Sequence, residues 1–184
     1  GSDECLFLAH LDRTVVLGCE PMKKLISVVL LVAMAGVGSW FFFTPKPAAP
    51  LVTFETLQNE SLPMASLRGK VVLVKFWATS CVTCVQQMPD TIALYNDLHA
   101  EGLEVVAVAM DYDPIEFVRN FVKARELPFV IAPDTSGEIA KAFGDVKLTP
   151  IAFLVDRDGR IVKRYLGVYE KQDMRKTVEK ALAG

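Results

Sequence analysis

Histidine and cysteine are scarce in this chain, which limits the metal chemistry that it could perform. The only histidines are His10 and His99, and Cys5 and Cys19 are the only cysteines outside one C-x-x-C motif. No second C-x-x-C and no H-x-x-x-H pair is present, which argues against a zinc site, because zinc takes four ligands. The formal net charge is -2 and no basic stripe occurs, which argues against a nucleic-acid partner.

The C-x-x-C motif is Cys81-Val82-Thr83-Cys84. It follows the apolar run Val71–Ala78 and precedes a helical pattern. Two cysteines three positions apart at the start of a helix can form a disulfide without distorting the backbone. The first sulfur also faces the free N–H groups of the helix N-terminus, which favour its thiolate. We therefore predict a redox pair with Cys81 as nucleophile and Cys84 as resolving thiol. A purely structural disulfide is the alternative, although so short a loop would stabilise little.

One long uncharged segment precedes the rest of the chain. Leu25–Phe43 spans 19 residues without a charge, and Lys23 and Lys24 flank its start. This length just suffices for a membrane-spanning helix, and the flanking lysines predict a cytoplasmic N-terminus. A signal peptide cleaved near Ala33-Met34-Ala35 is the competing interpretation. The length of the run favours an uncleaved anchor in a bacterial inner membrane, with the domain that follows in the periplasm or otherwise outside the cytoplasm.

The chain divides into four predicted parts. Residues 1–21 form an upstream leader, either native or a remnant before Met22. Residues 22–43 are the anchor or signal segment, and residues 44–50 form a linker with three prolines that suits an extended spacer. Residues 51–184 are expected to fold as one domain.

Strand and helix signals alternate along residues 51–184. Apolar, β-branched runs predict strands, and amphipathic patterns predict helices. Pro89 is expected to kink the first helix, Asp113 to cap the second, and Ser136 or Asp134 to cap the third. The predicted strands are Leu51–Leu57, Leu62–Met64, Val71–Ala78, Leu103–Met110, Phe129–Ala132, Ile151–Val155 and Ile161–Tyr165, and the predicted helices are Cys81–Ala100, Pro114–Arg125, Glu138–Phe143 and Lys171–Ala183.

This order predicts an α/β fold of the thioredoxin-like, three-layer type. Its central sheet would be mixed, with an inserted β-α unit at Leu103–Arg125 and an N-terminal β-hairpin. Three stretches, "GKVVLVKFWATSCVTCVQQMP", "GLEVVAVAMDYDP" and "LTPIAFLVDRDGRIV", resemble the membrane-anchored TlpA/ResA-like thiol-disulfide oxidoreductases over roughly residues 51–184. The resemblance implies exchange with protein thiols and disulfides, electrons from a membrane protein, and no cofactor beyond the cysteine pair. We also expect a monomer.

The resemblance extends to side chains around the cysteine pair. It implies that Trp77 lies beside the active site and shields it. It also implies that Thr149-Pro150 is a loop with a cis proline, whose Thr149 backbone contacts an extended substrate. From the residues alone, Pro150 could equally be an ordinary proline before a strand.

One charged residue departs from the family pattern, and a second could take over the proton-handling role. Lys75 stands where thioredoxins carry a buried acid. If Lys75 faces the dithiol, it favours thiolate, and if it extends to the surface it has no catalytic role. Asp111 ends the next strand and is a candidate for the proton-handling role of that missing acid.

The most direct function is thiol-disulfide exchange as a reductant, because Val82 and Thr83 carry no charge that would strongly stabilise a thiolate. Cytochrome c maturation and reduction of copper-site cysteines are the reactions that the resemblance implies. A copper-binding or copper-delivery module on the same fold is the alternative, although that role usually uses C-x-x-x-C with a distant histidine. A peroxidase is not expected, because the cysteine pattern of that class is missing.

Overall fold

The computed structural model describes residues 26–32, 34 and 46–184. The chain divides into two units, residues 1–45 and residues 46–184. In the first, residues 26–32 and 34 are helical, whereas the predicted leader and the rest of the predicted anchor lie outside the described residues. Among the described residues, no helix has both the length and the apolar character needed to cross a bilayer.

The second unit contains seven strands, four α-helices and two short 3-10 helices among its described residues. Helix α2 begins directly after Cys81 and continues through Pro89. The elements, in chain order, are β1 Thr53–Glu55, β2 Ser61–Pro63, η1 Met64–Leu67, β3 Val71–Trp77, α2 Val82–Leu98, η2 His99–Glu101, β4 Leu103–Ala109, α3 Ile115–Arg125, β5 Val130–Pro133, α4 Glu138–Ala142, β6 Ile151–Val155, β7 Ile161–Leu166 and α5 Lys171–Ala183.

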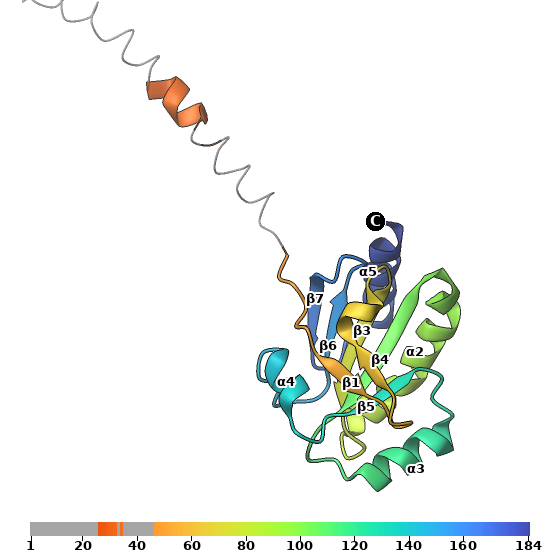
Figure 1. The fold of residues 1–184 in the computed structure, drawn as a ribbon. Coiled ribbons are helices and arrows are strands. Elements are labelled where there is room, and N and C mark those ends of the chain that lie inside the picture. Colours follow the sequence, from red (N-terminus) through yellow and green to blue (C-terminus); the bar gives the residue numbers. More distant parts are fainter. Residues whose placement is uncertain (1–25, 33, 35–45) are drawn as a thin grey trace, which may run out of the picture. The chain divides into compact units, whose positions relative to one another are not determined.

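Five of the strands form one mixed sheet in the order β5-β4-β3-β6-β7 (Figure 1). Strands β3, β4 and β5 are parallel, and β6 and β7 run antiparallel to their neighbours. Strands β1 and β2 form a separate antiparallel hairpin. The inserted unit is β4 with α3. The predicted thioredoxin-like fold, mixed sheet and N-terminal hairpin are confirmed.

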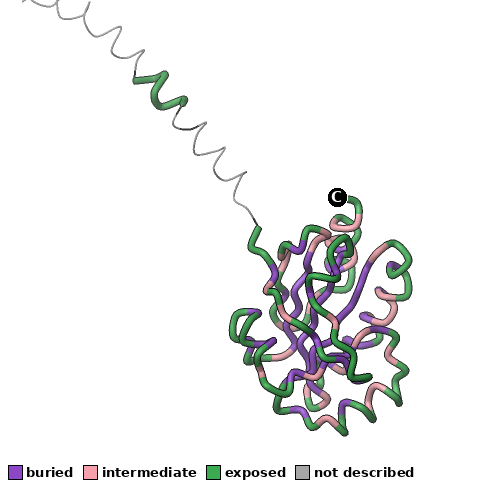
Figure 2. Tube along the Cα trace, viewed as in Figure 1, coloured by how far each residue is buried: buried purple, intermediate pink, exposed green. Residues whose placement is uncertain are grey.

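The central strand β3 is buried along its whole length and belongs to the purple interior in Figure 2. Successive side chains of a strand alternate between the two faces of the sheet. Leu73 and Trp77 join a cluster with residues of α2, α3 and α5, whereas Val74 and Phe76 join a second cluster under α4 and η1. Two apolar layers of this kind, one on each face of the sheet, produce the three-layer architecture. Lys75 is the one charged residue within β3.

The turn between β6 and β7 follows the Asp-Gly signal in the sequence. Gly159 has a φ of 71°, a conformation that costs glycine little, and the Asp156 carboxylate accepts a hydrogen bond from the Arg160 N–H at 2.9 Å. Part of the predicted linker packs against this turn. Ala48 forms a β-bridge with Arg160, and the Ala49 N–H donates to the Gly159 carbonyl at 2.9 Å. Residues 46–50 thus lie on the domain instead of forming a free spacer.

Candidate functional site

The cysteine pair lies where the central strand passes into α2. Cys81 is the N-cap residue of α2 and is bonded to Cys84 in a disulfide, with a Cα–Cα distance of 5.2 Å. The Cys81 Sγ also accepts a hydrogen bond from the Cys84 N–H at 3.2 Å. Cys84 is fully buried, whereas Cys81 is partly exposed. An N-cap sulfur that faces free N–H groups is stabilised as a thiolate when the bond is reduced.

A carboxylate from the inserted unit holds the turn that leads into this helix. Asp113 accepts hydrogen bonds from the Thr79 N–H and the Thr79 hydroxyl, both at 2.6 Å, and it is buried. The prediction that Asp113 caps α3 was wrong, because the N-cap residue is Pro114 and makes no side-chain cap bond. The carboxylate instead satisfies polar groups two residues before Cys81. The N-cap residue of α4 is Gly137 and not Ser136 or Asp134, although the Asp134 carboxylate accepts hydrogen bonds from the Ile139 and Ala140 N–H groups in the first turn of α4.

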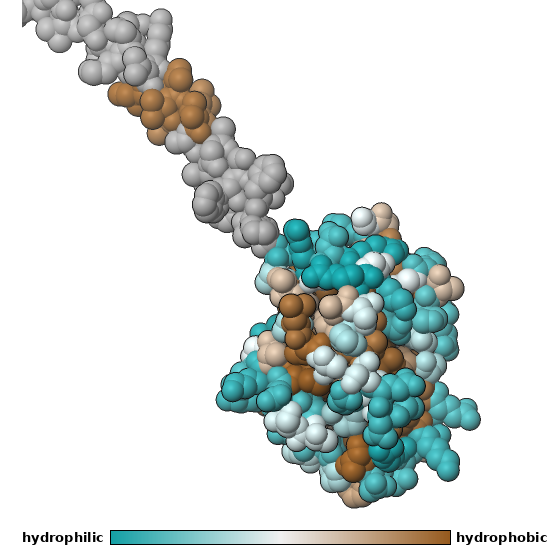
Figure 3. All heavy atoms as spheres, in the orientation of Figure 1, coloured by the Kyte–Doolittle hydropathy of each residue, from teal (hydrophilic) through white to brown (hydrophobic). Residues whose placement is uncertain are grey.

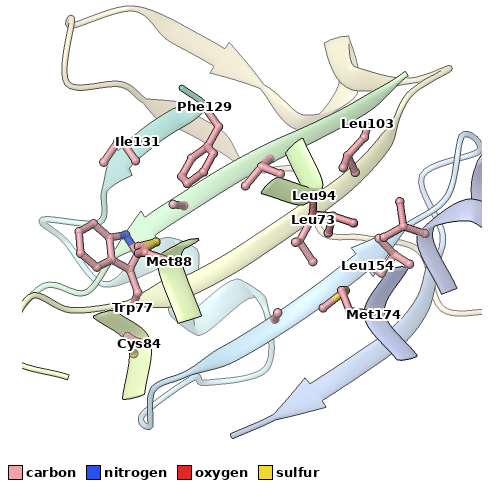
Figure 4. Close-up of a cluster of buried hydrophobic side chains, with 14 of the residues drawn as sticks. Leu73, Trp77, Cys84, Met88, Leu94, Leu103, Phe129, Ile131, Leu154 and Met174 are labelled. Carbon is pink, nitrogen blue, oxygen red and sulfur yellow. The ribbon is translucent and has the colours of Figure 1, made fainter. Parts of the chain in front are cut away.

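Trp77 lies beneath the cysteine pair. It is fully buried, and its ring centroid is 5.2 Å from that of Phe121 on α3. Figure 4 shows Trp77 with Cys84 and Met88 in one apolar cluster. Packing of this kind separates the inner sulfur from solvent, which agrees with the position expected for Trp77.

The Thr149-Pro150 peptide bond is cis, as the family resemblance implied. Ile151 pairs with Phe76, which brings the loop level with the end of β3. The hydroxyls of Thr149 and Tyr112 are 3.4 Å apart, so the loop before β6 meets the loop after β4. Tyr112 and Leu148 are 54% and 69% exposed, and together they form an accessible apolar border beside the loop. Figure 3 shows one face of this unit, on which hydrophilic side chains predominate and hydrophobic side chains gather near the middle and at the lower edge.

Lys75 does not reach the surface. Its side chain is fully buried on the same face of the sheet as Leu73 and Trp77. Its Nζ donates to the Thr91 hydroxyl at 3.0 Å and to the Tyr169 hydroxyl at 3.3 Å. Burial lowers the pKa of Lys75 from 10.5 to about 7, and the Asp90 carboxylate opposes this effect.

The structure places Asp111 apart from these groups. Asp111 is exposed, and its Oδ2 lies 3.3 Å from the position that a Cβ would take at Gly137, before α4. Its role in proton transfer stays a prediction. Among the described residues, no group of three or more His, Cys, Asp or Glu side chains is placed to hold a metal ion.

Sequence reasoning missed two residues of the site, Thr91 and Tyr169, and one contact, that of Asp113 with Thr79. Thr91 follows Cys84 by seven positions and therefore lies on the same inner face of α2, so a polar residue there was a usable signal. Tyr169 follows β7 in the chain, and no local pattern connects it to β3. The Thr79–Asp113 contact links two loops 34 positions apart, which a single sequence does not show.

Comparisons with known proteins agree with this geometry. The family model described as Redoxin matches residues 45–182. The thiol-disulfide oxidoreductase ResA of Bacillus thuringiensis subsp. konkukian (strain 97-27) is 31% identical over 162 residues, covering 83% of this chain and 92% of its own. ResA of Bacillus cereus (strain ATCC 10987 / NRS 248) is 33% identical over 132 residues, covering 72% and 75%.

Two solved structures show the same fold. A putative thioredoxin from Neisseria meningitidis superposes with a TM-score of 0.70 at 34% identity, covering 76% of this chain and 92% of the other. A putative thiol:disulfide interchange protein DsbE from Chlorobium tepidum gives a TM-score of 0.69 at 27% identity, covering 74% and 96%. Together with the buried–exposed cysteine pair, these similarities show that the chain belongs to the Redoxin family, as a ResA-like thiol-disulfide oxidoreductase.

Proposed function

We propose that this protein reduces disulfides of protein substrates outside the cytoplasm through the Cys81/Cys84 pair. The observation that carries the proposal is the unequal exposure of the two sulfurs, with Cys81 reachable at the helix N-terminus and Cys84 buried beneath it. Exchange needs one accessible thiolate for attack and a second thiol that stays protected until the mixed disulfide has formed.

The reaction proceeds in two exchanges. The Cys81 thiolate attacks a substrate disulfide, forms a bond to one substrate sulfur and releases the other as a thiolate, which takes up a proton. Cys84 then loses its proton and attacks the Cys81 sulfur. The Cys81–Cys84 bond forms, the bond to the substrate breaks, and the second substrate sulfur leaves as a thiol. The substrate gains two electrons, and the protein loses them.

The direction of electron flow rests on the chemistry around the pair. Val82 and Thr83 lie between the cysteines, and neither carries a charge that would stabilise the reduced form strongly. A pair without that stabilisation is a weak oxidant, which suits a reductant. Such a reductant needs a membrane protein as electron donor, and the uncharged segment 25–43 would hold it at the inner membrane. Apocytochrome c and copper-site cysteines are the proposed substrates.

The reduction potential of the Cys81/Cys84 pair tests this direction. The full chain with Cys5→Ser and Cys19→Ser, purified in mild detergent, is equilibrated with glutathione or dithiothreitol buffers, and the oxidised fraction is read by peptide mass spectrometry. A potential near that of thioredoxin, about -270 mV, supports a reductant, and one near -120 mV refutes it. The original chain is the matched control, since removing the two upstream cysteines should leave the potential unchanged.

A separate measurement tests the location. Alkaline phosphatase fused after Gly184 is active only where its own disulfides form, so an exported domain gives active enzyme. A matched fusion that lacks residues 22–43 should be inactive. Activity of that shortened fusion, or inactivity of the full one, would contradict the proposed location.

A further inference from the structure

The buried amine of Lys75 has no role in the exchange steps described so far. None of the ion pairs among residues 46–184 includes Lys75. The cross-strand neighbours of Lys75 are Ala107 on β4 and Ala152 on β6, and these small residues leave room for its long side chain beneath α2. A buried lysine without a carboxylate partner is costly, so its presence calls for a function.

Two hydroxyls hold the amine in place. The Thr91 hydroxyl donates to the Gln87 carbonyl at 3.1 Å, so its lone pairs are free to accept from Lys75 Nζ. The Tyr169 hydroxyl lies 3.1 Å from that of Thr91, and its ring centroid lies 5.2 Å from the amine. Burial raises the pKa of the Tyr169 phenol, which keeps this group neutral. The hydroxyl oxygens of Thr91 and Tyr169 can accept the two N–H groups of a neutral amine. The face of the Tyr169 ring also interacts favourably with the charged ammonium form.

The amine is close enough to Cys84 for its charge to matter. Cys84 and Thr91 lie seven residues apart on the inner face of α2, which corresponds to about 10 Å along the helix. Gln87 lies between them and donates to the Tyr169 carbonyl at 3.3 Å, which ties Tyr169 to the same helix. Inside a protein, a unit charge still acts over a separation of this order, so a positive charge held at Thr91 favours the thiolate of Cys84 over its thiol.

Neighbouring charges do not cancel this field. Asp90 is the carboxylate whose charge raises the pKa of Lys75, and it is paired with Lys171 at 2.9 Å. Directly beside Lys75, the flanking strands contribute only Ala107 and Ala152. Of the charged side chains on the elements packed around the amine, Asp90 is the one that acts on the pKa of Lys75. The titratable or charged side chains on these elements are Cys84, Asp90, Tyr95 and Asp97 on α2, Lys163, Arg164 and Tyr165 on β7, Tyr169 before α5, and Lys171, Asp173, Arg175, Lys176, Glu179 and Lys180 on α5.

We propose that Lys75, held by Thr91 and Tyr169, is a positioning residue whose positive charge favours the Cys84 thiolate in the resolving step. The charge is present in mildly acidic solution and is lost as the amine deprotonates, so the assistance depends on pH. Cys84 gives its proton to solvent and attacks the Cys81 sulfur, and the departing substrate thiolate takes up a proton. This inference rests on the proposed exchange chemistry of the pair but not on its direction or location.

The test compares the original full chain in detergent with Lys75→Met, which removes the charge at similar length. Two reactions of the reduced protein are followed from about pH 6 to about pH 9.5, namely reduction of insulin and oxidation by glutathione disulfide. We expect Lys75→Met to react about tenfold more slowly near pH 6 and at nearly the original rate near pH 9.5. Lys163→Met, on the exposed lysine of β7, is the control and should follow the original profile.

Other outcomes separate the inference from its alternatives. A loss of rate that is the same at every pH would show a structural role and overturn the proposal, as would identical profiles. Tyr169→Phe is the second variant, and it removes one hydrogen-bond acceptor of the Lys75 amine. It should react more slowly than the original protein near pH 6, and this result is informative even if Lys75→Met folds poorly. If the protein does not reduce insulin but its oxidation by glutathione disulfide shows the expected pH profile, the proposed reduction of protein substrates is refuted. The role of Lys75 would then still stand.

Discussion

The burial of Lys75 predicts how the stability of this protein depends on pH. An unfolded lysine has its ordinary pKa of 10.5, whereas burial lowers the pKa of Lys75 in the folded state to about 7. Between these two values the unfolded chain binds more protons than the folded one, so the free energy of unfolding rises with pH. The cost of the buried amine is therefore largest below the folded pKa and disappears above the unfolded one.

The magnitude follows from the two pKa values. One pKa unit corresponds to about 1.4 kcal/mol, so the ionisation penalty of Lys75 is on the order of 4 kcal/mol near pH 7 and about 2 kcal/mol near pH 9. The side chain is fully buried, so solvent screening does not reduce this value greatly. From pH 7 to pH 9, the free energy of unfolding of the original protein should thus rise by about 2 kcal/mol more than that of Lys75→Met. Near pH 7, Lys75→Met should be more stable than the original protein, because it does not carry the ionisation penalty of Lys75. The hydroxyls of Thr91 and Tyr169 can still bond to each other in this variant.

Urea unfolding of the oxidised protein measures this difference. Fluorescence of the buried Trp77 reports the transition, with Trp40→Phe present in both proteins so that one indole is observed. Each protein is unfolded near pH 7 and near pH 9, and the change in unfolding free energy is compared. Lys163→Met serves as the control with an exposed lysine. An equal pH dependence in the original protein and in Lys75→Met would show that the amine is not desolvated in the folded state, and the argument would fail.

Three further changes test other contacts. Cys84→Ser should accumulate a mixed disulfide between Cys81 and insulin on a non-reducing gel, whereas Cys81→Ser should not; trapping by both variants equally would contradict the assigned order of attack. Asp113→Ala removes both hydrogen bonds to Thr79 and should lower unfolding free energy by about 1–3 kcal/mol and slow exchange, with Thr79→Ser as the control that keeps both bonds. Leu154→Ala should cost about 2–5 kcal/mol in urea unfolding without changing the rate per folded molecule.

Local patterns in the sequence predicted most of the fold. The apolar run before the cysteines became β3, and the next apolar run became β4, with ends within one residue of those expected. These elements are buried on both faces, so their composition alone identifies them. The hairpin of β1 and β2 was also predicted, although β1 is two residues shorter at each end than the predicted strand.

The site was less predictable, because its contacts join distant segments. Asp113 looked like a cap because it precedes a proline at a helix start. Its carboxylate instead accepts two hydrogen bonds from Thr79, in the turn before Cys81. The position of Lys75 stayed undecided in the sequence. It was settled by Ala107 and Ala152, which lie beside it only after the strands have paired.

The contact of Ala48 with Arg160 and the cysteine pair lie at opposite ends of the domain. The β6–β7 turn lies beside the first residues of β3, since Val155 pairs with Val72, whereas Cys81 follows the last. The seven residues of β3 separate the two ends by roughly 20 Å. Residues 46–48 therefore meet the domain at the end of β3 opposite the cysteine pair. A pull on these residues would load the β6–β7 hairpin at the edge of the sheet before it reached α2.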